Sequence, residues 1–187
     1  KDYFIERQGN FGNLLTGHSA AAPRYIECRL TQLALDTMFH PALTEMVPSY
    51  DGRNEEPVVL PTKLPVILMT GAEGIAVGMA TKILPHNLPE IWKAQIAVLQ
   101  KKKFALYPDF AQGGLMDVSG YEDGAGKIEV RAKIESKDRK TVVIRELPFG
   151  TTTEGLISSI ENSVQKGRVK ISSIDDFTTD KVEIELS

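Results

Sequence analysis

Cysteine is nearly absent from this 187-residue chain, which contains Cys28 alone. A single cysteine cannot form a disulfide within the chain and fits a protein of a reducing compartment. Long hydrophobic runs are also missing, because the apolar stretches 64–69 and 75–80 are far shorter than the ~20 residues that span a bilayer. The first residues show no secretory pattern. We therefore expect a cytoplasmic protein with no membrane segment.

An excess of positive charge is lacking as well, since the formal net charge is −3. Residues 1–110 hold eleven Lys and Arg against eleven Asp and Glu, whereas residues 111–187 hold eleven against fourteen. Affinity for duplex DNA depends on cations that neutralise phosphates. Bulk charge therefore does not indicate a DNA-binding protein, and a role on DNA would require local placement of cations or additional segments.

The first half of the chain contains many turn-forming residues and prolines. Glycine and asparagine predict a loop over 8–19, and four prolines predict an irregular surface path over 47–66. Between them, a helix is predicted from Pro23 to the His40-Pro41 stop, with Tyr25 and Arg29 on one face. The run 64–69 predicts a short buried strand. A second helix is predicted over 88–100, with its inward side chains being Ile91, Trp92, Ile96 and Leu99.

The second half alternates more regularly between charged and β-branched residues. Strands are predicted over 127–135 and 141–147, and a helix follows whose start has capping-box spacing between Thr151 and Glu154. Two further strands are predicted over 169–174 and 182–186. The order β-β-α-β-β indicates an α+β layer in which a helix covers one face of a sheet.

The dipeptide Arg24-Tyr25 is the strongest candidate for chemistry. A phenol is a weak nucleophile at neutral pH unless its anion is stabilised, and a neighbouring guanidinium stabilises the anion and holds a phosphate. A tyrosine can then displace a sugar oxygen and retain the phosphate as an ester, which stores the energy of the backbone bond. The dipeptide alone is far more often a surface or packing feature, so its surroundings decide the interpretation.

Those surroundings resemble the active-site segment of type IIA topoisomerase A subunits, the family of gyrase A and topoisomerase IV A. The resemblance begins with Gln8-Gly9-Asn10-Phe11-Gly12 and Ala20-Ala21-Ala22-Pro23-Arg24-Tyr25. It continues through Tyr50-Asp51-Gly52, Pro61-Thr62-Lys63-Leu64-Pro65, the run from Gly74 to Thr81 and Pro85-His86-Asn87-Leu88. Over 8–88 the ordered set is highly specific, whereas residues 111–187 agree mainly in pattern and position.

The resemblance implies that Tyr25 forms a 5′-phosphotyrosyl link to duplex DNA and that Arg24 supports the transition state and the phosphate. It implies an A2B2 heterotetramer in which two A subunits cut opposite strands. The partner B subunit holds most of the Mg²⁺ and hydrolyses ATP, so no metal or nucleotide site is expected in this chain alone. Residues 1–110 would form the active-site region with part of a winged helix, and 111–187 a tower-like α+β domain.

Ile75 is the second residue to which the resemblance assigns a role. In the family, the isoleucine of a Gly-Ile-Ala-Val-Gly run wedges between base steps and bends the DNA. An apolar wedge costs a few kcal/mol of unstacking, which the additional contacts of bent DNA offset. From the run alone, close packing between Gly74 and Gly78 would be the favoured interpretation. The family resemblance favours the wedge instead.

Four further residues are candidate contacts to DNA, although each residue type is more often a solvated or structural side chain. They are Lys63, Lys82, His86 and Arg29. Lys101-Lys102-Lys103 is interpreted as the end of a helix, where cations suit the dipole. The aspartates 175, 176 and 180 fit no metal-ligand spacing.

Three departures from the usual family pattern favour topoisomerase IV over gyrase: Pro23, His18 and Glu73. The chain itself is interpreted as a piece that is inactive alone, because the groove-binding helix and the metal site are expected elsewhere. Two alternatives remain at this point. One is a non-catalytic DNA-binding or scaffolding module of the same fold, and the other is a small-molecule enzyme that uses the glycine-rich segment.

Overall fold

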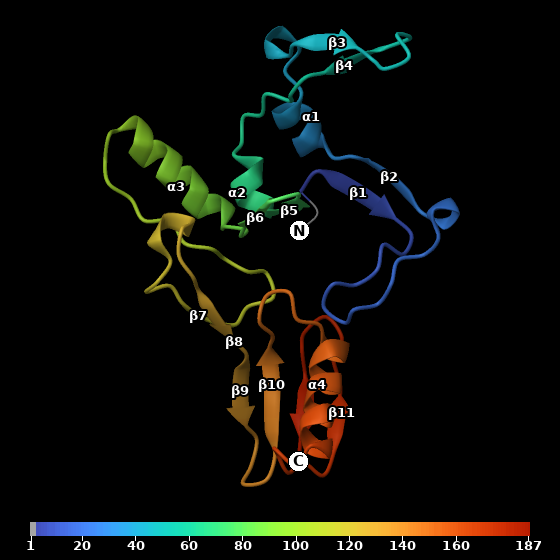
Figure 1. The fold of residues 1–187 in the computed structure, drawn as a ribbon, viewed down its shortest axis with the longest axis vertical. Helices are drawn as coiled ribbons and strands as arrows, with labels where there is room; N and C mark the ends of the chain where they lie inside the picture. The colour runs from blue at the N-terminus through green and yellow to red at the C-terminus, as the bar shows by residue number, and fades with distance from the viewer. Residues whose placement is uncertain (1–2) are drawn as a thin grey trace. The chain divides into compact units, whose positions relative to one another are not determined.

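A computed structural model describes residues 3–187 and divides the chain into two compact units. Unit 1 is formed by the segment that ends at Gly9 and by Ala22–Ala105, and unit 2 by Asn10–Ala21 and Leu106–Ser187. The described part combines short helices with one four-stranded and four two-stranded antiparallel sheets. Figure 1 shows the arrangement of helices and strands within each unit. The predicted α+β class is therefore confirmed.

Unit 1 begins with a two-stranded ribbon in place of the helix predicted from Pro23. Strand β1 (Ile5–Gln8) pairs with β2 (Glu27–Leu30), and only Pro23–Tyr25 forms a single 3-10 turn, η1. The helix prediction was wrong over 26–31 because Ile26, Cys28 and Leu30 also alternate at the strand period. Pairing with β1 decided between the two periods, which is a tertiary contribution.

Helix α1 (Gln32–Met38) is the part of the predicted helix that does form. The hydroxyl of Thr31 caps it by accepting from the amide of Ala34 at 3.2 Å. A 3-10 turn, η2 (Pro41–Leu43), then leads into the hairpin of β3 (Met46–Pro48) and β4 (Glu55–Pro57). All six residues of this hairpin's strands are exposed.

The run 64–69, predicted to be a strand, contains a short helix, α2 (Val66–Thr70). A brief apolar run does not distinguish strand from helix, and here Pro65 starts the turn by accepting from Leu68 at 3.0 Å. The helix ends at Gly71, whose φ is +72°. Strands β5 (Ala72–Ala76) and β6 (Met79–Ile83) follow as a tight hairpin.

Helix α3 (Leu88–Leu99) confirms the predicted helix, but its inward face differs from the prediction. Ile91 is 1% exposed and Ala94 is also buried, so these residues form the inner face. Trp92, Ile96 and Leu99, which we predicted to be inward, are exposed. The i to i+3 pair of Ile91 and Ala94 therefore defines a narrow contact stripe instead of a broad apolar face.

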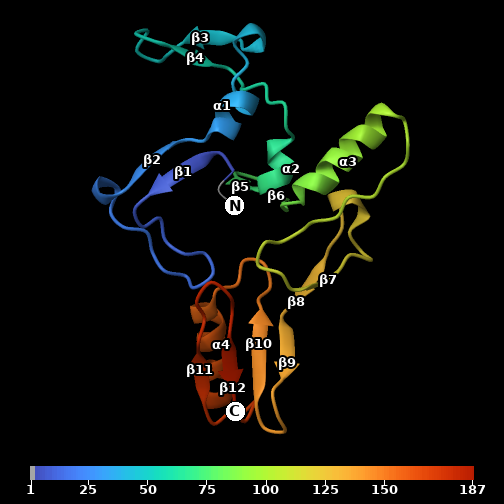
Figure 2. The same cartoon turned by 180° about the vertical axis from the view of Figure 1, so that it is seen from behind.

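Unit 2 contains a small ribbon and the main sheet. Strands β7 (Leu115–Asp117) and β8 (Glu129–Arg131) pair across a loop with a 3-10 turn, η3 (Glu122–Gly124). The main sheet comprises β9 (Lys133–Ser136), β10 (Val142–Glu146), β11 (Ile174–Asp176) and β12 (Ile184–Leu186). Its order is β11-β12-β10-β9, and Figure 2 shows β12 beside β10 from behind.

Helix α4 (Thr153–Gln165) covers one face of this sheet and completes the predicted β-β-α-β-β order. Ile144, Leu147, Val182 and Ile184 form the buried core, against which Leu156, Ile157 and Ile160 of the helix pack. Leu15 also packs there, and its carbonyl accepts from the amide of Thr153 at 2.9 Å. The helix cap is Thr152, one residue after the predicted Thr151, and its hydroxyl accepts from Gly155 at 3.1 Å.

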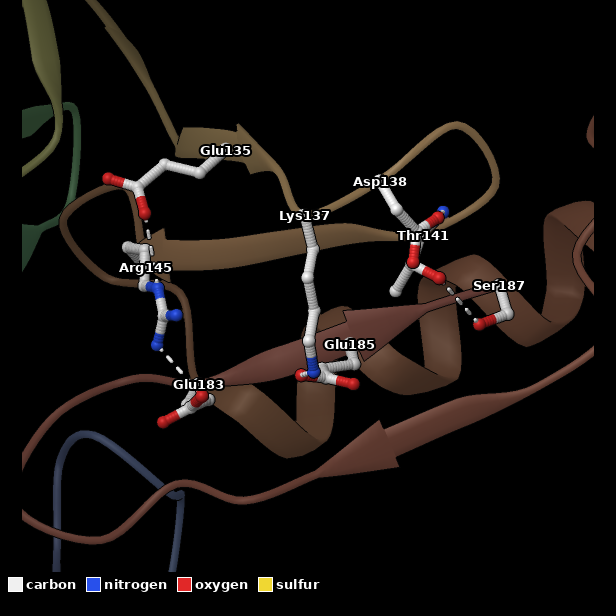
Figure 3. Close-up of polar contacts among 8 residues, drawn as sticks. All are labelled: Glu135, Lys137, Asp138, Thr141, Arg145, Glu183, Glu185 and Ser187. Carbon is white, nitrogen blue, oxygen red and sulfur yellow. Dashed lines mark hydrogen bonds and ion pairs between the residues drawn. The ribbon is translucent and has the colours of Figure 1, made fainter.

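The opposite face of the sheet is charged. Arg145 on β10 forms ion pairs with Glu135 and Glu183, with N–O distances of 3.3 and 2.9 Å. Lys137 forms an ion pair with Glu185, and Figure 3 shows all three pairs. Val143 lies on this face between its strand partners Glu135 and Glu185 but is only 1% exposed. Long charged side chains can shield apolar surface with their aliphatic stems, which accounts for the low exposure of Val143 on a charged face.

Candidate nucleic-acid interface

The pair Arg24 and Tyr25 lies in the 3-10 turn η1, which exposes it. The amide of Tyr25 donates to the Ala22 carbonyl at 2.9 Å, and that of Ile26 to the Pro23 carbonyl at 3.3 Å. Gly9 packs closely against this turn. A Cβ added at Gly9 would lie 2.8 Å from the Tyr25 carbonyl oxygen, and its φ of +95° also favours glycine. Tyr25 itself is 68% exposed, so its side chain is accessible to a large partner.

The Arg24 guanidinium lies over the phenol ring of Tyr25. Its central carbon lies 4.8 Å from the centroid of the Tyr25 ring, over the ring face. A cation in this position is attracted by the ring quadrupole and holds the two side chains together. The turn therefore presents, on one exposed surface, a phenol that can serve as a nucleophile and a planar donor group that can bind phosphate oxygens.

Arg29 lies on the ribbon that carries this turn, but not on a helical face with Tyr25 as predicted. It is in strand β2 and forms a two-bond ion pair with Glu6 on β1, with N–O distances of 2.7 and 3.0 Å. The hydrogen bond from Arg29, followed by its charge, lowers the pKa of Glu6. This carboxylate neutralises Arg29 locally, so a phosphate would have to displace Glu6 in order to use its charge.

The hairpin of β5 and β6 carries Ile75. Its register pairs Ala76 with Met79, which leaves Val77 and Gly78 as a two-residue turn, and Gly78 has a φ of +75°. Ile75, Val77 and Met79 are 87%, 104% and 73% exposed, respectively. Three apolar side chains are therefore exposed close together in the sequence at the tip of this hairpin, a feature that is common where a protein contacts a partner.

One face of the same hairpin combines the wedge candidate with a pair of charges. Ile75 lies opposite Ala80, and Glu73 lies opposite Lys82, so all four side chains leave the ribbon on one side. Lys82 Nζ is 3.9 Å from Glu73 Oε2. No hydrogen bond or ion pair in residues 3–187 links this face to Arg24 or Tyr25.

Lys63 and His86 occupy more structural positions than the hairpin residues do. Lys63 Nζ donates to the Asp36 carbonyl at 2.9 Å, in helix α1. His86 is 3% exposed, its amide donates to the Leu68 carbonyl at 2.8 Å, and its Nδ1 lies 3.2 Å from the same oxygen. A ring this buried offers no surface to a phosphate, so the structure gives no support to His86 as a contact to DNA.

Two further findings concern other classes of site. Among residues 3–187, no three His, Cys, Asp or Glu side chains are grouped in a way that could hold a metal ion. Within the same range, none of the helices has the length and apolar character needed to cross a bilayer.

Sequence reasoning missed three residues of this surface, namely Val77, Met79 and Glu73 as the partner of Lys82. Hydropathy alone would place Val77 and Met79 inside, yet both are exposed. The available signal was Gly78 next to Val77, which allows a two-residue turn and thereby sets which residues face each other across the hairpin.

Comparison with known proteins identifies the family. The family model for the A subunits of DNA gyrase and topoisomerase IV matches residues 1–187. The chain is 60% identical over its whole length to the DNA topoisomerase 4 A subunit of Borreliella burgdorferi. It is 37% identical over 90% of its length to the DNA gyrase A subunit of Lawsonia intracellularis, and 35% identical over 89% to that of Helicobacter pylori.

The chain spans 30% of the length of the Borreliella protein and 23% and 22% of the two gyrase proteins. Its identity to the topoisomerase 4 protein is much higher than its identity to either gyrase protein. The match extends over both structural units and includes the Arg24-Tyr25 turn and the hairpin of Ile75. The chain belongs to the family of DNA gyrase and topoisomerase IV A subunits, which are type IIA topoisomerases.

Proposed function

We propose that this chain provides the nucleophile with which a type IIA topoisomerase cleaves duplex DNA. Tyr25 Oη attacks a backbone phosphorus, the P–O3′ bond breaks, and the 3′ oxygen takes up a proton while the 5′ phosphate stays on the tyrosine. Reversal by the 3′ hydroxyl restores the strand and frees Tyr25. No water or cofactor is consumed in this exchange of one ester for another.

The single observation that carries this proposal is the exposed phenol with Arg24 over its ring. The planar guanidinium fits phosphate oxygens in a bidentate manner and stabilises the charge that develops during attack. A buried hydroxyl would have argued for a packing role instead. Family membership supports the choice of DNA as substrate over other phosphodiesters.

The β5–β6 hairpin provides a second contact to DNA. Ile75 inserts between base steps and bends the duplex, and the exposed Val77 and Met79 contact the neighbouring sugars or bases. Lys82, Lys63 and Arg29 then contact phosphates, each by leaving a present partner: Glu73, the Asp36 carbonyl or Glu6. All of these residues belong to unit 1.

Family membership supports the proposed assembly and cofactors. The chain works within an A subunit that dimerises and binds a B subunit in an A2B2 heterotetramer, which acts on the chromosome in the cytoplasm. The B subunit holds Mg²⁺ and hydrolyses ATP. Residues 1–110 form the active-site region with part of a winged helix and 111–187 a tower-like domain. The 60% identity favours topoisomerase IV over gyrase.

Cleavage by the full-length protein tests the proposal. The protein is combined with its B partner, Mg²⁺, ATP and supercoiled plasmid, and trapped protein–DNA adducts are counted for wild type, Tyr25→Phe and Tyr50→Phe. Tyr50 is a matched control because it is another exposed tyrosine of unit 1. We expect Tyr25→Phe to abolish adducts and Tyr50→Phe to retain them, while both bind DNA.

Two outcomes would overturn the assignment. Adducts that persist in Tyr25→Phe would place the nucleophile elsewhere. An absence of adducts from the full-length wild-type protein, despite DNA binding, would favour the scaffolding module. The isolated 187-residue chain is expected to form no adducts in the same assay, because the metal site belongs to the B subunit.

A further inference from the structure

Glu73 is the acidic member of the β5–β6 face, two residues before the exposed Ile75. The hairpin register places its side chain on the same side as Ile75 and directly opposite Lys82. Both charged side chains are well exposed, at 67% and 62%. Any duplex that contacts Ile75 from this side would therefore meet the carboxylate as well as the ammonium group.

The ion pair between the two residues is weak. Its N–O distance of 3.9 Å lies near the limit for such pairs, and exposed pairs of this kind contribute little to stability. Lys82 can therefore turn from Glu73 to a phosphate at almost no cost. The carboxylate would then lose its counter-charge and would repel any phosphate within a Debye length, about 8 Å at physiological salt.

We propose that Glu73 lowers the affinity of the hairpin for DNA and thereby keeps insertion of the Ile75 wedge reversible. With Glu73 present, this face of the hairpin is electrically neutral, and its affinity for the duplex depends mainly on apolar contact. Without Glu73, the same face carries the charge of Lys82 alone and attracts phosphates. Glu73 is thus a positioning residue that does not take part in bond exchange. The inference rests on the proposed wedge role of Ile75.

Reversibility suits an enzyme that must release its DNA after resealing. A lysine without a neighbouring acid would add phosphate contacts to the bent complex. Such contacts would slow release of the DNA, because changes in an interface act mainly on the dissociation rate. An acid placed opposite that lysine offsets the added attraction whenever Lys82 moves to the backbone. The bent state then has a shorter lifetime at the same wedge geometry.

DNA bending measured in the full-length protein with its B partner tests this role. A fluorescently labelled duplex reports bending and affinity in a Tyr25→Phe background, so that cleavage does not enter. Glu73→Gln is compared with Glu56→Gln, which removes the same charge from the exposed β4 strand. We expect Glu73→Gln to raise affinity about two- to fivefold and to slow unbending, with a steeper dependence on salt.

Lys82→Gln should lower affinity, and adding it to Glu73→Gln should remove most of the gain. An unchanged or lower affinity for Glu73→Gln, or an equal gain for Glu56→Gln, would overturn the inference. Ile75→Ala separates it from the proposed function. If Ile75→Ala leaves bending intact, the wedge assignment fails. If bending is lost there but Glu73→Gln has no effect, only the role of Glu73 fails.

Discussion

At Gly71 the backbone passes so close to Ile83 that a side chain does not fit. A Cβ there would lie 2.6 Å from the Ile83 carbonyl oxygen, and the φ of +72° already disfavours any side chain. This residue joins α2 to β5 and so determines where the hairpin begins. Single residues of this kind position the candidate interface without belonging to it.

Gly71→Ala is therefore expected to destabilise unit 1 by more than Gly52→Ala does. Gly52 has a similar φ of +67° but open space around it, so its substitution measures backbone strain alone. We expect an extra loss of at least about 1 kcal/mol for Gly71→Ala, from the backbone clash. Urea unfolding of both variants gives the difference, and equal midpoints would contradict the steric explanation.

Among the structural elements, the four-stranded sheet with α4 has two chemically different faces. One face carries the apolar core and the other the charges shown in Figure 3. The turn between β9 and β10 is stabilised by Asp138, whose Oδ1 accepts from the amides of Lys140 and Thr141 at 2.7 and 2.8 Å. These donors, first of all the Lys140 amide, lower the pKa of Asp138 below its ordinary value.

Asp138 therefore predicts a pH dependence of stability. A carboxyl whose pKa is lowered on folding contributes stability above its unfolded pKa, near ~3.9, and loses that contribution as the pH falls through the folded value. We expect Asp138→Asn to be less stable than wild type at pH 6, with a gap that shrinks below pH ~4. Asp180→Asn controls for the loss of one charge, and a gap that is independent of pH would contradict the mechanism.

Over the whole molecule, buried apolar residues are distributed unevenly between the two units. Among the described residues of unit 1, only Ala34, Met69, Ile91 and Ala94 are buried hydrophobics. Unit 2 buries larger side chains, namely Phe110, Val143, Ile144, Leu147, Val182 and Ile184. Because stability scales with buried apolar area, unit 2 should be the more stable unit of the 187-residue chain.

Hydrogen exchange of the 187-residue chain tests this difference. Amides of β10, β12 and α4 are expected to exchange slowest, because their opening requires loss of the unit 2 core. Amides of β3 and β4 should exchange fastest, since every residue of both strands is exposed. Equal protection in the two hairpin strands and the core strands would contradict the assignment of stability to unit 2.

Local patterns predicted unit 2 more reliably than unit 1. Strands were predicted over 127–135, where β8 and β9 form, and over 141–147, where β10 forms. A capping signal predicted the start of α4 to within a residue. In unit 1 the apolar residues fit both the helical and the strand period, so a helix was predicted at β2, which pairs with β1. A strand was predicted where the short helix α2 forms. Tertiary partners decided these segments because their local preferences are nearly balanced.

The amino-acid sequence alone determined the family, the candidate nucleophile Tyr25 with Arg24, and the α+β class, because these depend on residue identity, order and period. Only the tertiary structure decided which side chains are accessible. It exposed Ile75, Val77 and Met79, buried His86, and placed Glu73 opposite Lys82. The physical reason is that exposure and cross-strand pairing arise from register and from packing between segments, which no local pattern of residues encodes.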